Sequence, residues 1–397
     1  MFNPTLKTRL VIDGTEYRFS PHPAAPALVW GQEGRHAIVY RIEPLDGSRG
    51  SNGEARALKV FRPAFRHAGL LESARALRWA HELPGMRVCD QTVITRKTHP
   101  HLVAEHEDLD YAMVMPWIDG QTWFDYLHKR ERLTLDQSRA LAESIAWVLY
   151  ALELNALAHC DLSSGNVIVD PSQTTVYLVD VEDLYSPWLT PPPQVPAGTP
   201  GYQHREVGSL GQWRPAGDRF AGAVLMAEVL AWVHPKVRQA AYGESYFAPE
   251  DLQQDCERYR LLLKVLKMYD KAFAEVFEAA WRSHSLEECP PLKTWYDLFD
   301  SLPRGPVASW APINPREFAD REPRPPAVAQ PMGGEDKARP EQTRRERRSQ
   351  PQGARSQRRR KKRSGCRAIA IVVGVAGLLC CYALALAVQW SVLQNIF

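Results

Sequence analysis

The chain has 397 residues, of which 45% are hydrophobic and 24% charged, so it is long enough to bury a large core in one two-lobed domain. Its seven cysteines show neither a disulfide framework nor the C-x-x-C spacing of a metal site, which excludes a disulfide-stabilised scaffold and favours reduced thiols. The formal net charge of +3 hides an asymmetry. Residues 344–367 contain twelve Lys or Arg and one Glu, a net of +11, so the rest of the chain carries −8.

The first elements expected along the chain are strands. Residues 8–12 and 15–19 flank Asp13-Gly14, a pair typical of the two-residue turn of a β-hairpin. A glycine-containing stretch, 29–40, follows, and after it comes an apolar run, 56–61, that holds one lysine. These patterns predict a β-rich N-terminal part.

Helices are expected next. Residues 70–83 repeat apolar side chains at helical spacing, and residues 111–120 predict one further strand. Residues 134–156 form the clearest helix, because Thr134-Leu135-Asp136-Gln137 matches a capping box and five apolar residues fall on one stripe. The chain thus changes from strands to helices near its first third.

The segment 159–180 gathers polar side chains around an expected hairpin. Two apolar runs are separated by a turn-forming stretch, 170–175, with Asn166 just before the first run and Asp180 just after the second. These two side chains should converge, since the start of one hairpin strand lies beside the end of the next. Asp161, five residues before Asn166, can face the same point. Carboxylate and amide oxygens suit Mg²⁺, and a second carboxylate can act as a base for a hydroxyl.

The spacing His-x-Asp-x-x-x-x-Asn, followed by an Asp after a hairpin, resembles the catalytic and metal-binding segments of the protein kinase superfamily. By that resemblance, Asp161 orients or deprotonates the acceptor hydroxyl, and His159 supports it. Asn166 and Asp180 would hold the Mg²⁺ ions of ATP, with Mn²⁺ as the alternative metal. Lys59, in an Ala-Leu-Lys-Val setting, resembles the strand lysine that pairs with the phosphates.

The resemblance also assigns residues around the nucleotide. Gly31 and Gly34 stand where a glycine-rich hairpin covers the ATP phosphates, although the three-glycine spacing of the family is not met. Met115 would guard the back of the adenine pocket. Trp117 and Ile118 would lie in the hinge that offers backbone groups to adenine.

Supporting residues follow from the same resemblance. The family places on the helix after the lysine strand a glutamate that pairs with this lysine, and Glu72 is our first candidate, with Glu82 second. The segment 198–206 resembles the end of an activation segment, which Glu206 closes. Asp218 resembles the aspartate that braces the catalytic loop.

Departures from the family pattern are specific. Cys160 stands where many kinases have the arginine that binds an activation-loop phosphate, and Ser163 replaces a lysine that contacts the transferred phosphate. Val181-Glu182-Asp183 replaces the usual Phe-Gly after Asp180. Cys289 occupies the approximate place of the arginine that pairs with Glu206, so we expect that ionic brace to be missing.

The resemblance implies an α+β, two-lobed protein-kinase-like fold, with a catalytic domain at 1–302. A small β-rich N-lobe would span about 8–118 and a larger helical C-lobe about 119–302. The segments expected after it are a Pro-rich disordered linker at 303–343, a basic juxtamembrane segment at 344–367, a transmembrane helix at 368–388 and a short extracytoplasmic tail at 389–397.

The transmembrane prediction rests on 21 residues without a charge, 368–388, which span roughly 30 Å as a helix. The basic run 344–367 on its N-terminal side would contact anionic lipid and place the kinase-like domain in the cytoplasm, so we expect a single-pass cell-membrane protein. A nucleic-acid partner is the rival interpretation of the basic run, and we do not expect it.

The sequence therefore predicts a membrane-anchored Ser/Thr protein kinase that transfers the γ-phosphate of Mg-ATP to hydroxyls of protein substrates. Two alternatives stay open: an ATP-binding or inactive pseudokinase scaffold, and a small-molecule phosphotransferase. Cys160, Ser163 and the incomplete glycine pattern favour the scaffold, whereas Lys59, Asp161 and the two metal-binding residues oppose it. Self-association also stays open.

Overall fold

The structure is a computed structural model that describes residues 2–45, 53–206 and 211–302. All of them belong to one compact unit, Met1–Gln330. The segments predicted at 303–343, 344–367, 368–388 and 389–397 lie outside the described residues. Within the described residues, no helix is long and apolar enough to cross a membrane.

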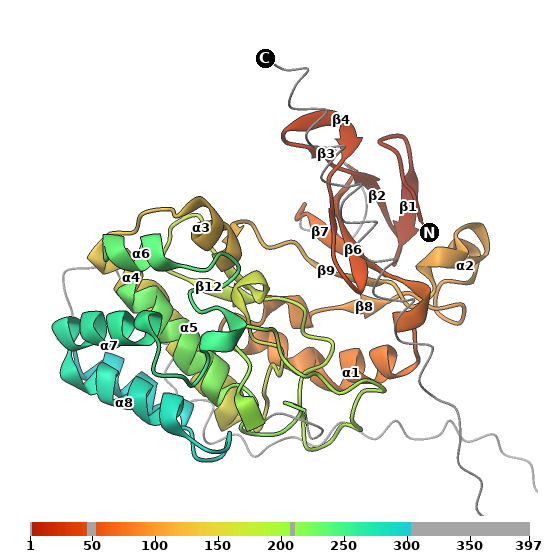
Figure 1. The fold of residues 1–397 in the computed structure, drawn as a ribbon. Helices are drawn as coiled ribbons and strands as arrows, with labels where there is room; N and C mark the ends of the chain where they lie inside the picture. Colours follow the sequence, from red (N-terminus) through yellow and green to blue (C-terminus); the bar gives the residue numbers. More distant parts are fainter. Residues whose placement is uncertain (1, 46–52, 207–210, 303–397) are drawn as a thin grey trace, which may run out of the picture. The chain divides into compact units, whose positions relative to one another are not determined.

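An antiparallel sheet forms the N-terminal part of this unit (Figure 1). Its strands are β1 (Arg9–Ile12), β2 (Thr15–Phe19), β5 (Gly31–Glu33), β6 (Ala37–Pro44), β7 (Arg56–Phe61), β8 (Thr92–Val93) and β9 (Met113–Pro116). The order is β1-β2-β6-β7-β9-β8, and β5 also pairs with β6. A separate hairpin joins β3 (Pro21–His22) to β4 (Ala25–Val29). The predicted hairpin around Asp13-Gly14 is confirmed, with both turn residues at positive φ, 50° and 78°.

The two faces of this sheet enter different cores. Because side chains alternate along a strand, Ala57 of β7 packs with Met113 and Met115 against the helical part, while Leu58 packs on the opposite face. Lys59 lies on the same face of β7 as Ala57. The alternation therefore directs the lysine toward the rest of the domain.

Two helices accompany the sheet. The first is α1 (Gly69–Leu77), which continues as a 3-10 turn, η2 (Arg78–Glu82), and the second is the short α2 (Pro100–Glu105). The buried side chains of α1 are Leu70, Ala74 and Leu77, the residues whose spacing predicts this helix. The α-helix therefore ends earlier than the predicted residue 83, at Leu77, and the 3-10 turn continues to Glu82.

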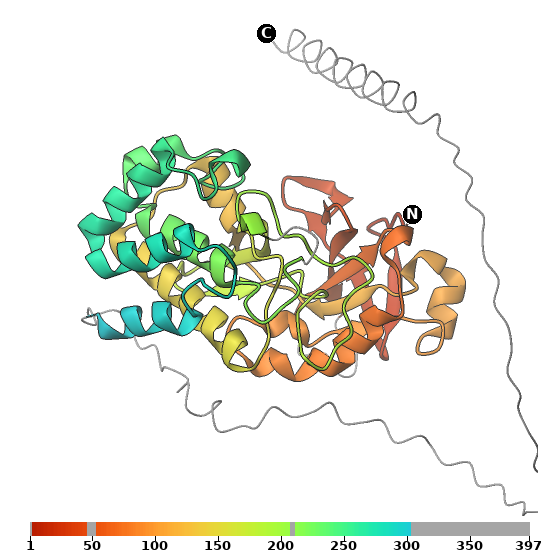
Figure 2. The same ribbon diagram turned by 60° about the horizontal axis from the view of Figure 1, so that its bottom comes forward.

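Helices dominate the remainder (Figure 2). They are α3 (Trp123–Lys129), α4 (Leu135–Leu154), α5 (Arg219–Ala231), α6 (Pro235–Ala240), α7 (Glu257–Tyr269), α8 (Lys271–Arg282) and α9 (Leu292–Ser301). A small sheet orders β10 (Gln121–Thr122), β11 (Val167–Val169) and β12 (Val176–Leu178). The predicted capping box of α4 is present, with the Thr134 side chain accepting from the Gln137 N–H.

Helix α5 is the centre of this helical part. Twelve of its thirteen residues are buried, and it packs against α4, α7 and α8. It carries one acidic side chain in the core, Glu228, which accepts hydrogen bonds from the Tyr202 hydroxyl at 3.1 Å and the Tyr246 N–H at 2.7 Å. Trp123 of α3 donates its ring N–H to the same carboxyl group. Mixed sheet and helix, divided into a β-rich and a helical part, are compatible with the two-lobed fold.

Candidate functional site

The β11–β12 hairpin brings the polar residues together as expected. Val167 pairs with Leu178, and the Val179 N–H donates to the Asn166 carbonyl at 3.0 Å. Asn166 and Asp180 therefore stand at the same end of the hairpin. The amide group of Asn166 donates to the Asp161 carbonyl at 2.7 Å, which ties the preceding loop to that end.

Lys59 joins the sheet to this hairpin. Its ammonium nitrogen lies 2.8 Å from Oδ1 of Asp180 and forms a second ion pair with Glu182. The lysine side chain is only 7% exposed, so its charge depends on these two carboxylates. Burial lowers the pKa of Lys59, but the two acids outweigh burial and hold the pKa well above its usual range.

Two further carboxyl groups stand near this pair. Burial raises the pKa of Asp161, although the Thr199 hydroxyl, which donates to its Oδ1 at 2.8 Å, acts against the shift. Burial and the charge of Glu182 raise the pKa of Asp183 to about 6. The Asp180 side chain is half-exposed, so only its partial burial acts to raise the pKa; Lys59 outweighs this effect and the net pKa is lowered. This carboxylate therefore stays ionised at neutral pH.

Asp218 fixes the loop that carries Asp161. Its carboxylate accepts the backbone N–H of His159 at 2.5 Å and of Cys160 at 2.8 Å. The His159 ring donates from Nε2 to the Val179 carbonyl at 2.8 Å. The loop is thus held on one side by Asp218, which immediately precedes α5, and on the other by the hairpin, and this positions the Asp161 side chain.

The predicted glycines lie in the β5–β6 hairpin. A Cβ atom on Gly31 would come within 2.9 Å of the Tyr40 ring, and the Gly34 N–H donates to the Ala37 carbonyl at 2.8 Å across the turn. Arg62, just after β7, donates to the Gly34 carbonyl at 3.3 Å. A tight turn fastened to the lysine strand is what a phosphate-covering hairpin requires, and phosphate binding here stays a prediction.

The residues predicted around adenine follow β9. Met115 lies opposite Ala57 of β7, and both it and Ile118 are buried. Trp117 lies edge-on to Trp30, with 5.0 Å between ring centroids. Its backbone N–H already donates to the Ala55 carbonyl at 3.1 Å. This N–H is therefore engaged within the chain.

The α1 glutamates are placed differently from the expectation. Glu72 lies on the exposed side of α1, and Glu82 is exposed in the following 3-10 turn. Lys59 is paired with Asp180 and Glu182 instead. The reason is geometric, because the buried face of α1 is wholly apolar and Glu72 points away from it.

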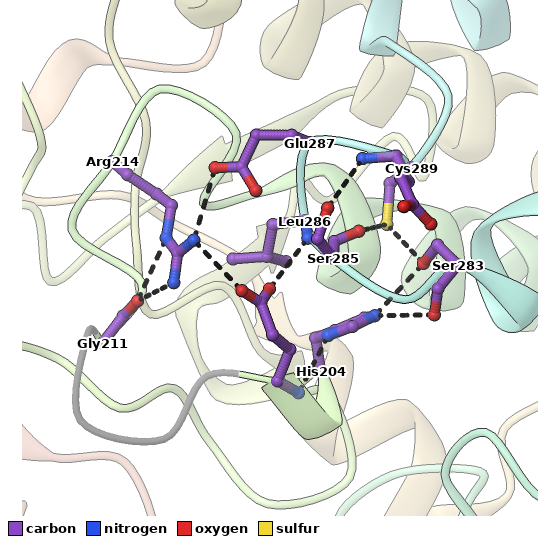
Figure 3. Close-up of polar contacts among 10 residues, drawn as sticks. His204, Gly211, Arg214, Ser283, Ser285, Leu286, Glu287 and Cys289 are labelled. Carbon is purple, nitrogen blue, oxygen red and sulfur yellow. Dashed lines mark hydrogen bonds and ion pairs between the residues drawn. The ribbon is translucent and has the colours of Figure 1, made fainter.

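The expectation that Glu206 lacks an ionic brace is wrong. Arg214 supplies it, with its guanidinium 3.7 Å from Oε1 of Glu206 and 3.3 Å from Glu287. Figure 3 shows Arg214 between Glu287 and the Gly211 carbonyl, to which it also donates. Cys289 indeed lies nearby, but its thiol donates to the Ser285 carbonyl at 3.6 Å. The arginine therefore comes from the segment before α5, not from the one before α9.

The two departures in the catalytic-type loop are buried. Cys160 is 0% exposed and its thiol faces the Ala158 carbonyl at 3.5 Å, while burial raises its pKa well above the usual range. Ser163 is buried as well. Neither side chain offers a positive charge to a phosphate. In the part of the chain that the structure describes, the buried lysine at this site is Lys59.

The donor set fits a cation that is shared with a ligand. Among the described residues, no group of three or more His, Cys, Asp or Glu is placed to hold a metal ion by itself. Mg²⁺ in phosphate-binding sites commonly takes only one or two protein ligands besides phosphate oxygens and waters. Since the Asn166 nitrogen is used by Asp161, its side-chain oxygen and the half-exposed Asp180 are the atoms that suit such an ion.

Glu182, Thr199 and Arg214 have contacts at the site that the sequence patterns do not assign to them. Glu182 carried a usable signal, because it is one of two acidic residues that follow Asp180 within three positions. Thr199 and Arg214 gave none, because their contacts depend on how the long segment between β12 and α5 folds back.

The comparisons with known proteins give a distant similarity. A stretch of 86 residues is 30% identical to the SNF1-related protein kinase catalytic subunit alpha KIN12 of Arabidopsis thaliana. This stretch is 21% of the present chain and covers 17% of the length of that relative. No family model matches the chain. The similarity is thus to part of a protein kinase.

Proposed function

We propose that the chain is a protein kinase that transfers the γ-phosphate of Mg-ATP to Ser or Thr hydroxyls of proteins. The observation that carries this proposal is the contact of Lys59 with Asp180 beside Asp161 and Asn166. A cation, a candidate base and two oxygen-bearing side chains thereby come from separate segments to one region of the domain. The distant similarity to a protein kinase supports the same class of reaction.

Each residue has a chemical role in this proposal. Lys59 would bind phosphate oxygens, and Asn166 and Asp180 would hold Mg²⁺, which neutralises phosphate charge when bound. Asp161 would accept the proton of the attacking hydroxyl. Because burial raises its pKa, Asp161 is a stronger base than a solvent-exposed aspartate once it is ionised.

A protein acceptor is favoured over a small molecule by the segment near Asp161. Thr199 donates to the Asp161 carboxylate, and Tyr202, three residues later, is fixed to Glu228 of α5. The segment 198–206 is therefore held against the site by the core of the helical part. An ordered segment of this kind provides a surface on which an extended peptide can lie.

An ATP-binding scaffold without transfer activity is the second candidate. Cys160 and Ser163 lack the cationic side chains that the family pattern has at these positions, and both are buried. Charge stabilisation of the transferred phosphate would then be weaker than usual. Lys59, Asp161 and Asp180 would still allow nucleotide binding.

The decisive experiment is transfer of labelled γ-phosphate from ATP with Mg²⁺ to a generic protein acceptor by the full-length chain. We expect Lys59→Met, Asp161→Asn and Asp180→Asn each to lower incorporation by at least about 100-fold. Lys271→Met is the matched control, because this lysine is 82% exposed in an ion pair on α8. It should leave incorporation unchanged.

The same samples separate the alternatives. Thermal stabilisation by Mg-ATP that Lys59→Met removes, without any phosphate transfer, would indicate the scaffold. Neither transfer nor stabilisation would contradict the proposal. Transfer to small hydroxyl compounds but not to proteins would indicate a small-molecule phosphotransferase.

The membrane anchor is a separate part of the proposal. Its support is the uncharged segment 368–388 beside the basic run 344–367, which would place the kinase-like domain in the cytoplasm at the cell membrane. The described residues provide no second candidate for a membrane span. Anchoring would concentrate the enzyme near substrates in the membrane plane.

A further inference from the structure

The two acidic partners of Lys59 differ in their surroundings. The Glu182 side chain is 10% exposed, close to the 7% of Lys59 itself, whereas the Asp180 side chain is 53% exposed. Glu182 is therefore enclosed with the lysine, and Asp180 lies at the open side of the pair. Both acids come from the same short segment after β12.

We propose that Glu182 is the positioning residue for Lys59, replacing a glutamate from α1. The inference rests on the proposed function, because positioning matters only if Lys59 binds phosphate. It assigns the two carboxylates different tasks. Glu182 holds the ammonium group in place, and Asp180 remains available at the open side for the metal-ligand role.

The energetics favour this division. A lysine with 7% exposure needs a close carboxylate, since an unpaired buried charge is strongly destabilising. Asp180 alone could not hold the lysine and also serve a cation without weakening one of the two contacts. Glu182 is enclosed and is not placed to contact a cation at the open side. The ion pair Lys59–Glu182 can therefore persist while Asp180 acts elsewhere.

The arrangement also means that helix α1 is not needed to hold Lys59. A lysine paired with an α1 glutamate would be released whenever that helix moved, but here Glu72 is on the exposed side of the helix. The lysine strand is instead tied to the hairpin segment that carries Asp180. Displacement of α1 by a partner should accordingly leave the charged site assembled.

A thermal double-mutant cycle tests the pairing without any assay of activity. Glu182→Gln is measured by its shift in Tm in the wild-type chain and in a Lys59→Met background. We expect a fall of at least about 2 °C in the wild type, because the lysine loses its enclosed partner. In the Lys59→Met background we expect no fall or a rise, because the glutamate is then a buried charge without its lysine.

Glu275→Gln is the matched control, since Glu275 pairs with Lys271 at 2.8 Å but on an exposed surface. Its Tm shift should stay below about 1 °C in both backgrounds. Equal falls for Glu182→Gln with and without Lys59 would overturn the proposal. That result would give Glu182 a structural role unrelated to the lysine.

Enzyme kinetics provide a second test of the role of Glu182. Glu182→Gln should raise the KM for ATP and lower kcat/KM by at least about tenfold, and Glu182→Asp, which keeps the charge, should recover part of the loss. If Glu72→Gln instead caused these losses in kcat/KM and Glu182→Gln behaved like the wild type, the lysine would be positioned from α1. That result would refute the inference. If the wild type neither binds nor uses ATP, the proposed function fails, whereas the thermal cycle still decides the pairing.

Discussion

Glu228 carries a carboxyl group whose charge conflicts with its surroundings. It is fully buried in α5, and burial raises its pKa to about 7, although hydrogen bonds from Trp123, Tyr246 and Tyr202 act in the opposite direction. The ordinary value for a glutamate is 4.5. The group therefore changes its protonation state near neutral pH.

This conflict predicts how stability depends on pH. The folded chain keeps a proton that the unfolded chain releases above about pH 4.5, so stability should fall as pH rises toward 7 and then level off. Glu228→Gln removes the effect. The Tm of this variant relative to wild type should rise between pH 5 and 8, by an amount equivalent to at most about 3 kcal/mol at 1.36 kcal/mol per pKa unit.

Thermal unfolding of the wild type and of Glu228→Gln at several pH values measures this difference in Tm. Glu275→Gln, at an exposed position on α8, should show no such trend and serves as the control. A difference between Glu228→Gln and wild type that is constant from pH 5 to 8 would contradict the assignment of the titration to this residue.

Residue roles were predictable where a pattern fixes both the residue type and its strand or loop position. The convergence of Asn166 and Asp180 follows from hairpin register, and the direction of Lys59 follows from strand alternation. The partner of Lys59 did not follow, because it depends on where the α1 glutamates point in three dimensions. Only the packed structure shows Glu72 exposed and Glu182 enclosed.

At the scale of the elements, the segment that ends at Glu206 is held by a single arginine side chain. Arg214 is 15% exposed and binds Glu206, Glu287 and the Gly211 carbonyl together. These contacts join the end of the segment to the loop before α9. Removing the arginine would leave Glu206 with the Leu286 N–H, at 3.2 Å, as its remaining contact to that loop.

Arg214→Met should therefore increase local opening of the segment 198–206 more than it lowers the stability of the whole domain. We expect hydrogen exchange in residues 198–206 to speed up at least about tenfold, while exchange in α4 stays unchanged. Arg260→Met is the control, since Arg260 pairs with Asp255 on an exposed surface. Uniform acceleration in all helices would show that Arg214 supports global stability and not this segment.

Element boundaries were predictable where local chemistry decides them. The Asp13-Gly14 turn and the capping box of α4 are local signals, and both were confirmed. The arginine that pairs with Glu206 was not predictable from spacing, because residues 1–302 contain many arginines. Only the path of the loop before α5 brings Arg214 to this glutamate.

At the scale of the whole molecule, we propose that a membrane anchor follows the kinase-like domain. Deletion of 368–388 should abolish flotation of the chain with neutral liposomes, because it removes the apolar span. Replacing the basic residues among 358–363 with Gln should weaken flotation with anionic vesicles but not with neutral ones. Flotation of the deleted chain with neutral vesicles would contradict the anchor, and loss of DNA binding in the second variant would favour the nucleic-acid interpretation.

The brace from Asp218 also has a consequence for the order of folding. Its carboxylate closes contacts to backbone groups 58 and 59 residues earlier in the sequence. Such long-range closure is entropically costly, so it should form late, after α5 has docked on α4. The loop that carries Asp161 would then acquire its final shape only in an otherwise completed domain. A newly made chain would thus be unable to use its charged site before its core is finished.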